Sequence, residues 1–367
     1  MRVSYSYLDR QFTELDGFFD DIQETVRRGD FTLGAAVSEF ERRFAELCGV
    51  PYAVGVGCGT DALLLALKVL GIGTGHEVIT AANTFIATIG AISLAGARPI
   101  LVDNGADYTI DVDLLEGAIT ARTKAIVPVH LTGTIADMPV VREIAERHNL
   151  AVIEDAAQAI LASRDGKNAG AWGDLGCFSL HPLKNLNIWG DGGVVVTRSA
   201  EYFEQLRLLR NHGLVNRDEA VIFGHNSRLD TIQAAVGSRL IGDVPSITDK
   251  RNENAGRYDR AFADLTDFVD IPPRHANVRQ VFHTYIIRVK HRDKLLAYLK
   301  DHGVSAKVHY PVPVHLQPAA RPLGYKLGDF PKCETDCGSI ITLPVHQHLM
   351  DEEIEYVIDR VREFYGA

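Results

Sequence analysis

The spacing of apolar residues predicts a sheet whose strands are separated by helices. Between residues 51 and 197, short Val/Ile-rich runs alternate with segments whose apolar residues recur at helical spacing. Such alternation is typical of right-handed βαβ crossovers and a mostly parallel sheet. We therefore predict an α/β fold with seven strands in one sheet between helices. The seven runs are 51–57, 77–85, 98–103, 123–133, 150–157, 176–181 and 192–199.

The last two runs, GCFSLH and GGVVVTRS, are joined only by the polar residues 182–191. A crossover between parallel strands needs a dozen or more residues, usually including a helix. We therefore expect one of these two strands to run antiparallel to its neighbours.

Helical periodicity predicts the other elements of the first 242 residues. In segment 36–48, for example, Val37, Phe40 and Phe44 fall on one face, and Gly49 follows as a stop signal. A further helix follows the run GCGT, with Thr60 or Asp61 as its expected cap. The remaining helices are predicted at 18–30, 86–97, 111–120, 138–149, 200–213 and 231–241.

From about Asp243 onward the pattern changes to α+β. A long helix with a charged face is followed by alternating strands around another helix, a Pro-punctuated loop and a final amphipathic helix. A chain of 367 residues also exceeds what one hydrophobic core usually supports. We predict a large domain, 1–242, with an N-terminal arm, and a small C-terminal domain, 243–367. The C-terminal elements are helices 244–265, 292–303 and 351–365, strands 281–290 and 303–310, and loop 309–320.

Composition and charge argue against several classes of protein. No apolar run approaches the length of a membrane span, and residues 1–30 carry charges throughout, unlike a signal peptide. The net charge is -10, and no basic run exceeds two residues, so we expect no nucleic-acid partner. The five cysteines lie mostly in apolar surroundings and predict buried thiols in the cytoplasm. Cys333 and Cys337 lack a second Cys/His pair at zinc spacing, so we expect no metal.

One lysine and one aspartate follow separate predicted strands. Lys184 lies in the loop between the last two runs, and Asp155 ends the run LAVIED. A lysine in such a loop is usually a solvated charge, but it can also be an amine positioned to attack a carbonyl. Both residues are expected at the carboxyl ends of strands, where open α/β sheets bind ligands.

A third strand end offers a possible phosphate site. A helix that begins directly after GCGT points free N–H groups and its positive dipole end at one place, near Gly59, Thr60 and Asp61. The alternative is a strand-to-helix turn that binds nothing. The glycines also resemble a dinucleotide fingerprint, and Glu77 lies at the distance of a ribose-binding acid, but Thr60 stands where the third glycine belongs.

An amine, an acid and an anion cradle together suit pyridoxal phosphate. The lysine would form a Schiff base with its aldehyde, and a carboxylate would keep its ring nitrogen protonated, which makes the ring an electron sink. The helix start would hold the phosphate. This combination predicts the cofactor more strongly than any one of the three features.

Six short motifs follow one another along the chain: GTDAL (59–63), NTFIAT (83–88), EDAAQA (154–159), FSLHPLKNL (178–186), HNSRLDTIQAA (225–235) and LPVHQHL (343–349). In sequence and order they resemble the DegT/DnrJ/EryC1/StrS family of aminotransferases. The resemblance runs from about Phe31 to the C-terminal helix. It implies an aspartate-aminotransferase-like fold (fold type I) and a homodimer whose two sites are shared across the interface.

The resemblance also implies a role for individual residues. Lys184 would be the Schiff-base lysine and proton carrier, and Asp155 would bind the ring nitrogen. Gln158 and Phe85 would lie against opposite faces of the ring. The phosphate would be bound by Gly59, Thr60, Asp61 and Ser179, and by Asn226 of the second subunit. Without this resemblance, we would interpret Phe85 as an ordinary core residue and Ser179 as a serine whose hydroxyl is hydrogen-bonded within the protein.

The substrate side is less defined. His309, Tyr310 and His315 lie in or beside the Pro-punctuated loop and are candidates for the substrate pocket, although ordinary loop histidines are commoner. Arg228 is a candidate for binding an anion, with an interface ion pair as the alternative. Leu183 stands where many relatives have a small or hydroxyl residue, and the large Trp189 is expected to shape the substrate side.

The resemblance implies transfer of an amino group from an amino acid, expected to be glutamate, to a keto sugar. Pyridoxamine phosphate would carry the amino group between the two halves of the reaction. The loop KNLNIWGDGG with NSRLD resembles the branch that acts on nucleotide-linked 3-keto hexoses, and a 4-keto sugar or keto cyclitol stays open. Three alternatives are a sugar dehydratase with the same cofactor, a non-catalytic regulatory protein that binds it, and a nicotinamide dehydrogenase.

Overall fold

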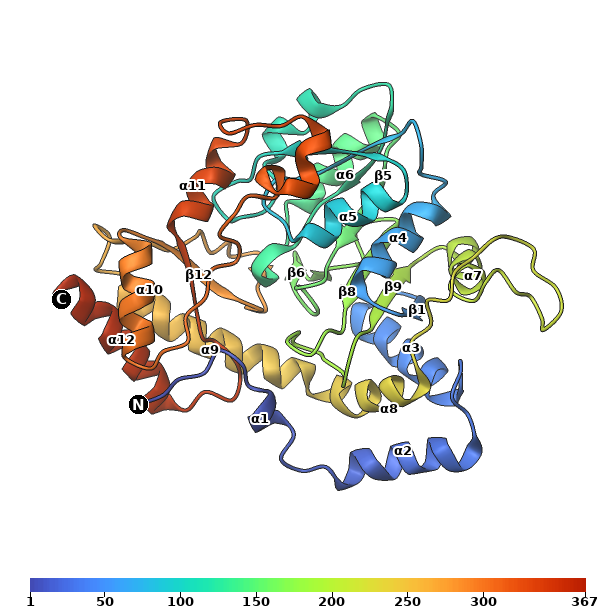
Figure 1. Cartoon of the computed structure of the whole chain (residues 1–367), viewed down its shortest axis with the longest axis horizontal. Coiled ribbons are helices and arrows are strands. Elements are labelled where there is room, and N and C mark those ends of the chain that lie inside the picture. Colours follow the sequence, from blue (N-terminus) through green and yellow to red (C-terminus); the bar gives the residue numbers. More distant parts are fainter.

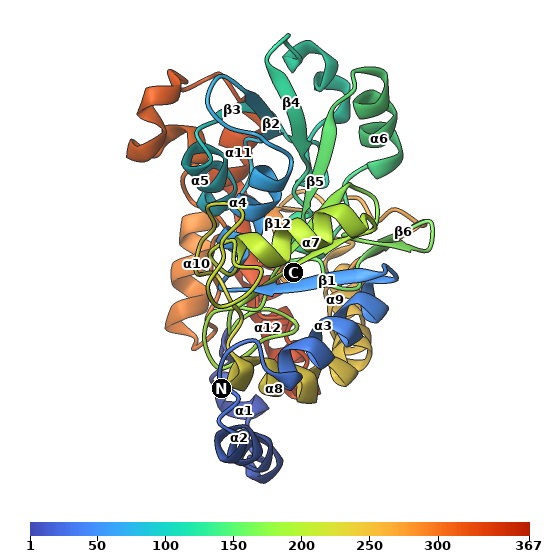
Figure 2. The ribbon, with the colours of Figure 1, turned by 90° about the vertical axis from the view of Figure 1, so that its right-hand side faces the viewer.

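The computed structural model describes all residues, Met1–Ala367, and its centre is a seven-stranded sheet (Figure 1). The seven predicted strands are all present, in the spatial order β1-β9-β8-β5-β4-β2-β3. Figure 2 shows the sheet twisting from β3 and β4 to β1. The strands are β1 (Tyr52–Val56), β2 (Glu77–Ala81), β3 (Arg98–Val102), β4 (Thr123–Val127), β5 (Ala151–Asp155), β8 (Leu175–Ser179) and β9 (Gly193–Thr197).

One strand reverses direction, as the short connection predicted. β9 pairs antiparallel with both β8 and β1, whereas β8, β5, β4, β2 and β3 pair in parallel. The carboxyl ends of β5 and β8 therefore meet at the same edge of the sheet, and this edge places Asp155 near the loop that begins after Ser179.

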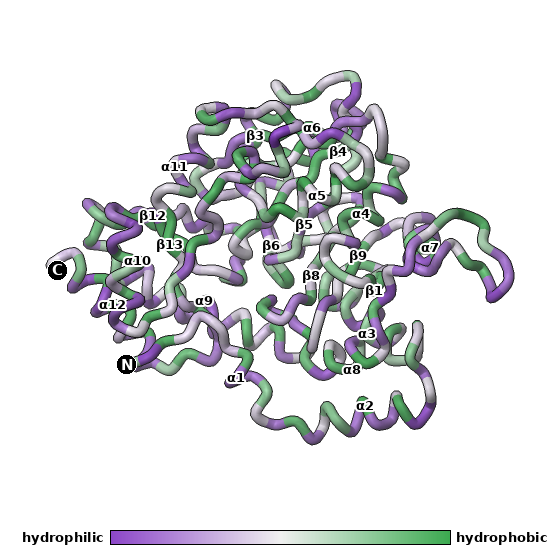
Figure 3. The backbone as a smooth tube through the Cα atoms, viewed as in Figure 1, coloured by the Kyte–Doolittle hydropathy of each residue, from purple (hydrophilic) through white to green (hydrophobic).

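Helices cover both faces of the sheet, because successive strand residues point to opposite sides. Val54 and Val195, for example, pack with α4, α5 and α7, whereas Ala53 and Val194 pack with α3, α6 and α8. Figure 3 shows the strands as largely apolar along their length. The covering helices are α3 (Ala35–Cys48), α4 (Gly59–Val69), α5 (Ile86–Leu94), α6 (Met138–Arg147), α7 (Ala200–Leu209) and α8 (Thr231–Leu240). These observations confirm the predicted α/β architecture.

A smaller α+β unit follows in the chain. Its three-stranded sheet has the order β10-β12-β13, and its core also contains Val3 from the N-terminus. The elements are β10 (Val269–Asp270), β12 (Tyr285–Val289), β13 (Ile340–Leu343), α9 (Val244–Phe262), α10 (Arg292–Asp301) and α12 (Asp351–Tyr365). The chain begins with α1 (Leu8–Gln11) and α2 (Asp16–Arg28), and both termini lie near this unit in Figure 1.

Several predicted details are wrong. Segment 111–120 forms two short 3₁₀ helices, Val112–Leu114 and Glu116–Ala118, instead of an α-helix; Gly117 in its middle has low helix propensity. Segment 303–310 makes only single bridges, at Val304 and Lys307, and the strands that pair with β12 are β10 and β13. The predicted loop 309–320 contains the 3₁₀ helix Val314–Leu316, and a second, Pro318–Leu323, extends beyond it.

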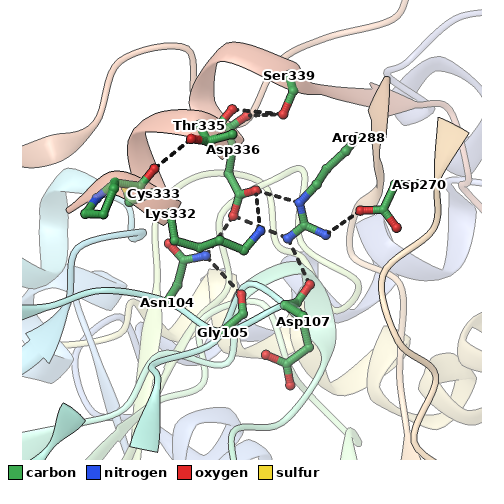
Figure 4. A network of polar contacts seen from close by, with 12 residues as sticks. Asn104, Gly105, Asp107, Asp270, Arg288, Lys332, Cys333, Thr335, Asp336 and Ser339 are labelled. Carbon is green, nitrogen blue, oxygen red and sulfur yellow. Dashed lines mark hydrogen bonds and ion pairs between the residues drawn. The ribbon is translucent and has the colours of Figure 1, made fainter. Parts of the chain in front are cut away.

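A buried ionic network joins the smaller unit to the loop after β3 (Figure 4). Asp336 of α11 (Pro331–Ser339) binds Arg288 of β12 and accepts a 2.7 Å hydrogen bond from Asn104 Nδ2. The backbone N–H groups of Lys332 and Cys333 donate to Asp103 at 2.9 and 2.8 Å. This network crosses between the two predicted domains and holds them together. The boundary at 242/243 stays a prediction.

A third, small sheet also links the two parts. It pairs β11 (Val278–Arg279) with β6 (Ser163–Arg164), which pairs in turn with β7 (Lys167–Asn168).

None of the helices combines the length and apolar character that crossing a membrane requires.

Candidate active site

A cavity of about 260 Å³ opens at the carboxyl ends of β5 and β8. It brings together most of the residues that the sequence singled out, from five separate segments of the chain. The predicted residues that line it are Gly59, Thr60, Phe85, Asp155, Gln158, Ser179, Lys184 and Tyr310. Cys58, Thr84, His130, His181 and Asp191 also line it.

Lys184 has an amine that is poised near neutral pH. Its side chain faces the cavity, and protein surrounds it on the other sides. This desolvation disfavours the charged form and lowers the pKa of Lys184 to about 8, an effect that Asp155 partly opposes. A substantial fraction of the amine is therefore neutral at mildly alkaline pH, and a neutral amine is the form that attacks a carbonyl carbon.

Asp155 ends β5 and is held by donors on both carboxylate oxygens. The hydroxyl of Thr88 donates to Oδ2 at 2.8 Å, and the N–H of Ala157 donates to Oδ1 at 3.2 Å. Thr84 and Thr88 lie one helical turn apart, and their hydroxyls are 2.7 Å from one another. Burial raises the pKa of Asp155, while the Thr88 hydroxyl, the Ala157 N–H and Lys184 lower it. A buried carboxylate with these donors suits a protonated ring nitrogen as its partner.

The first turn of α4 forms the opposite end of the cavity. Its cap is Cys58, whose Sγ accepts a 3.4 Å hydrogen bond from Asp61 N–H, and not Thr60 or Asp61 as predicted. The N–H group of Gly59 has no protein acceptor, and that of Thr60 has only the weakly accepting Sγ of Cys58. A Cβ at Gly59 would lie 2.8 Å from Ser179 Cβ, so glycine is required for this close approach. The residues therefore fit a phosphate group bound by free N–H groups and a serine hydroxyl.

Phe85, Tyr310 and Gln158 also line the cavity. Phe85, which is 51% exposed in this structure, packs against Tyr310 with ring centroids 5.5 Å apart. Gln158 Oε1 accepts a 2.7 Å hydrogen bond from the N–H of Thr132. A planar aromatic ring between the acid and the helix start would cover the exposed face of Phe85. Pyridoxal phosphate fits this set of donors and surfaces.

Other predicted residues lie outside the cavity. Trp189 packs against Phe12 and Phe18 of the N-terminal segment, with centroid distances of 5.7 and 5.2 Å. His315 is buried and lies 3.0 Å from Glu334, so the structure does not bring it to the substrate pocket. The structure therefore does not bring these two side chains to the cavity of their own chain: Trp189 is half-buried beside the N-terminal segment, and His315 is buried beside Glu334. Their role on the substrate side stays a prediction.

His309 lies behind the cavity wall and not in it. Its Nδ1 is 2.9 Å from Thr342 Oγ1, its ring stacks on Tyr5, and burial lowers its pKa to about 4. Asp61 also turns away from the cavity, because its carboxylate accepts a 2.6 Å hydrogen bond from Ser227. Only its backbone remains at the helix start.

A long loop projects from the body beside α7 (Figure 1). Asn226 and Arg228 belong to the segment between α7 and α8 that contains this loop, and Asn226 forms a β-bridge with Asn211 near the end of α7. Asn226 is exposed, and Arg228 donates a 2.9 Å hydrogen bond to Asn211 Oδ1. Neither residue lines the cavity of its own chain.

Glu154, which precedes Asp155, was not identified from the sequence. It is fully buried and accepts backbone hydrogen bonds of 2.8, 2.7 and 2.6 Å from Gly170, Trp172 and Gly173. His130 Nδ1 accepts from Ala136 N–H, so its Nε2 carries the proton and donates to Glu154 at 2.9 Å. The only sequence signal was an acid at a position expected to be buried.

Replacing Glu154 with glutamine is expected to lower the free energy of unfolding by about 3 kcal/mol. The amide NH₂ would face N–H donors in place of an acceptor, with no water to satisfy them. Urea denaturation followed by circular dichroism measures the loss. An unchanged unfolding midpoint would contradict this account of the carboxylate, and Glu143→Gln on the exposed face of α6 is the control.

Comparisons with known proteins agree with this geometry. The sequence profile of the DegT/DnrJ/EryC1/StrS aminotransferase family matches residues 14–362. A dTDP-3-amino-3,4,6-trideoxy-alpha-D-glucose transaminase of Streptomyces venezuelae is 40% identical over 99% of this chain and 96% of its own length. A pleiotropic regulatory protein of Geobacillus stearothermophilus is 41% identical over 94% of this chain and 93% of its own.

A solved structure supports the same relationship. The crystal structure of S. venezuelae DesV in complex with a ketimine intermediate superposes with a TM-score of 0.97 and 40% identity. The match covers 100% of this chain and 99% of that one.

Proposed function

Because this chain belongs to the DegT/DnrJ/EryC1/StrS aminotransferase family and is a pyridoxal-phosphate-dependent aminotransferase, we propose that it transfers an amino group from an amino acid to a nucleotide-linked keto sugar. The observation that carries the proposal is a single cavity that contains an amine with a pKa of about 8, a buried carboxylate and a free helix start.

We propose the following roles for the residues of this cavity. Lys184 would bind the aldehyde carbon of the cofactor, and Asp155 would bind its ring nitrogen. The N–H groups of Gly59 and Thr60, the backbone of Asp61 and the hydroxyl of Ser179 would hold the phosphate. Phe85 and Gln158 would lie against the two ring faces, with Tyr310 at the edge. The cofactor supplies an electron sink for the carbon that loses a proton.

Lys184 has a second proposed task, which is to move that proton. Its neutral amine would remove the proton from the α-carbon of the amino donor and return it to the cofactor carbon that carried the aldehyde. The hydrogen bonds that Thr88 and Ala157 donate to Asp155 favour its ionised form during this transfer. The lowered pKa of Lys184 suits this task, because a proton carrier works best when its pKa lies near the working pH.

The proposed substrates are glutamate and a 3-keto deoxyhexose carried by a nucleotide. The position of the carbonyl is inferred from the S. venezuelae relative, whose name specifies a 3-amino sugar. A 4-keto sugar is the second candidate. The five cysteines are free thiols, which supports the cytoplasmic location predicted from the sequence.

The test uses the loaded protein and follows the cofactor's visible absorbance. Glutamate should bleach the band in a single half-reaction, and the matching keto sugar should restore it. A panel of dTDP- and UDP-linked 3-keto and 4-keto sugars identifies the acceptor by the fastest return. Failure of glutamate and of every other amino acid to bleach the band would rule out the proposed function in favour of a regulatory role.

We further propose a homodimer in which the projecting loop completes the partner's site. Phe223 at the loop tip is fully exposed, and Val215, Val221 and Ile222 are 51, 51 and 39% exposed. Such a cluster of apolar side chains on one loop is typical of an interface. A hollow of about 660 Å³ between α3, β1 and α7 offers a surface beside it. Asn226, on the same loop, would then reach the phosphate of the second subunit.

The dimer proposal predicts the effect of Phe223→Asp. A carboxylate at this tip should weaken association, so sedimentation velocity at micromolar concentration should show more monomer and weaker cofactor retention. Leu327→Asp, at another exposed apolar side chain, is the matched control. A wild-type protein that sediments as a monomer would exclude the shared site.

The rate of cofactor loading should depend on pH in a defined way. Because the folded-state pKa of Lys184 is lowered to about 8, the neutral fraction rises through that pH. The rate of aldehyde capture by the apoprotein should increase roughly tenfold between pH 7 and pH 9 and then level off. Stopped-flow absorbance after mixing with pyridoxal phosphate measures it. A rate that keeps rising above pH 9 would indicate an unperturbed lysine.

A further inference from the structure

The N-terminal segment lies across the loop that carries Lys184. The hydroxyl of Tyr7 donates a 2.8 Å hydrogen bond to the main-chain carbonyl oxygen of Lys184. One helical turn later, Gln11 and Asn187 exchange two amide hydrogen bonds, each 2.9 Å long. Tyr7 and Asn187 are 3 and 0% exposed, so both contacts are shielded from water.

The same segment is anchored to the smaller unit. Val3 N–H donates to Gly303 at 2.9 Å, and Val3 accepts from Ser305 N–H at 2.9 Å. Arg10 forms a bidentate ion pair with the buried Glu353 at the start of α12, with both N···O distances 2.7 Å. We call residues 3–11 the strap, because they connect the lysine loop to the smaller unit.

The ring of Tyr7 is fixed by its surroundings. The guanidinium of Arg251 lies 5.3 Å from its centroid, a cation–π distance, and His346 and His348 lie at 5.4 and 5.7 Å. Arg251 is only 1% exposed and has no carboxylate partner; its Nη1 donates to the carbonyls of Phe282 and His283. Arg251 Nε also donates to Gln347 Oε1, so the electron-rich face of Tyr7 adds to three hydrogen bonds that stabilise this buried charge, and the guanidinium packed against the ring helps to hold the phenol in place.

The lysine loop depends on such external contacts. Two backbone hydrogen bonds lie within the loop or at its base: Lys184 N–H donates to His181, and Ile188 N–H donates to Leu180. These bonds determine the conformation of the loop, but they do not fix its position relative to the rest of the molecule. Three anchors come from outside the loop: the bond from Asn185 Nδ2 to the Val281 carbonyl, at 2.9 Å, the bond from Gln233 Nε2 to the Trp189 carbonyl, at 2.7 Å, and the strap. Of these, only the strap binds Lys184 itself.

We propose that Tyr7 is a positioning residue for Lys184. Its hydroxyl, held by the strap and by Arg251, sets the main-chain point from which the lysine side chain reaches the cavity. A lysine side chain has four rotatable bonds, so a displaced main chain spreads its amine over many positions, and catalytic steps are sensitive to displacements near 1 Å. The strap thereby couples the placement of the amine to the contact between the smaller unit and the sheet.

The test compares Tyr7→Phe with Tyr356→Phe in the cofactor-loaded, full-length protein. Tyr356 is a matched control, because its hydroxyl also donates to a backbone carbonyl, that of His302, at 3.0 Å, but far from the lysine loop. In Tyr7→Phe we expect kcat to fall roughly tenfold with the KM for the amino donor within about twofold. The pH at which the cofactor's visible band is half-converted should also move by about half a pH unit, because the surroundings of the lysine nitrogen change.

A second variant, Gln11→Leu, removes the amide pair and should shift the same midpoint in the same direction. The proposal is overturned if Tyr7→Phe keeps the wild-type kcat and midpoint, even with a lower melting temperature, or if Tyr356→Phe changes them equally. The proposal rests on the aminotransferase activity. Failure of this proposal can be distinguished from failure of the proposed function, because a wild-type band that glutamate bleaches would still establish the proposed function.

Discussion

Replacing Lys184 with alanine is expected to lower the rate of amino transfer at least about 10⁴-fold. Two tasks disappear together, because the same amine captures the cofactor and carries the proton. The cavity itself should persist, since Asp155, Ser179 and the start of α4 are held by contacts that do not involve the lysine side chain. Single-turnover absorbance with glutamate and then with the keto sugar measures each half-reaction.

Lys124→Ala is the control for this variant, because Lys124 is exposed on β4 and distant from the cavity. The control should keep the wild-type rate. A Lys184→Ala protein that still converts the keto sugar at a comparable rate would contradict the aminotransferase assignment of this lysine. That outcome would favour the sugar dehydratase alternative, whose chemistry does not need the amine.

Replacing Asp155 with asparagine is expected to lower the same rate roughly 10³-fold. The amide has nearly the same size but no charge, so it cannot keep a proton on the ring nitrogen. Without that proton the ring accepts electrons poorly from the carbon that is deprotonated. The measurement is the glutamate half-reaction, with the circular dichroism spectrum as a check that the fold is retained.

A companion variant tests the hydrogen bond to the Asp155 carboxylate separately from the carboxylate's charge. Thr88→Val removes the 2.8 Å donor to Asp155 but leaves the carboxylate in place. We expect a smaller loss of roughly 10- to 100-fold, because one hydrogen bond to a charged group is worth about 1.5–3 kcal/mol. Equal losses in Thr88→Val and Asp155→Asn would mean that the hydroxyl, and not the charge, is what matters.

The main sheet was predictable because its strands are buried on both faces. A strand buried on both faces must be apolar throughout, and this produces the Val/Ile-rich runs that are visible in the sequence. The reversed strand β9 was predictable as well, since ten residues cannot contain a crossover helix. Helices such as α3 and α12 were visible for a similar reason, because one apolar stripe faces the core.

The wrong predictions concern segments whose partners are distant in the sequence. Residues 303–310 alternate like a strand, but β13 takes the place beside β12, and Val304 pairs with Val3 instead. Alternation within one segment cannot show which of several segments pairs at a given edge of a sheet. The cap of α4 was likewise decided by the conformation of Cys58, which lies one residue before the candidates.

The sequence by itself determined the chemical groups of this protein: an amine at Lys184, an acid at Asp155 and a helix start at Gly59, each at a strand end where parallel topology gathers ligands. Only the tertiary structure decided how these groups are held. The bond from Thr88 to Asp155 spans 67 residues, and that from Tyr7 to Lys184 spans 177. Packing also places Trp189 and His315 outside the cavity. Residue type and spacing report local preferences, whereas such contacts depend on which surfaces meet when the whole chain folds.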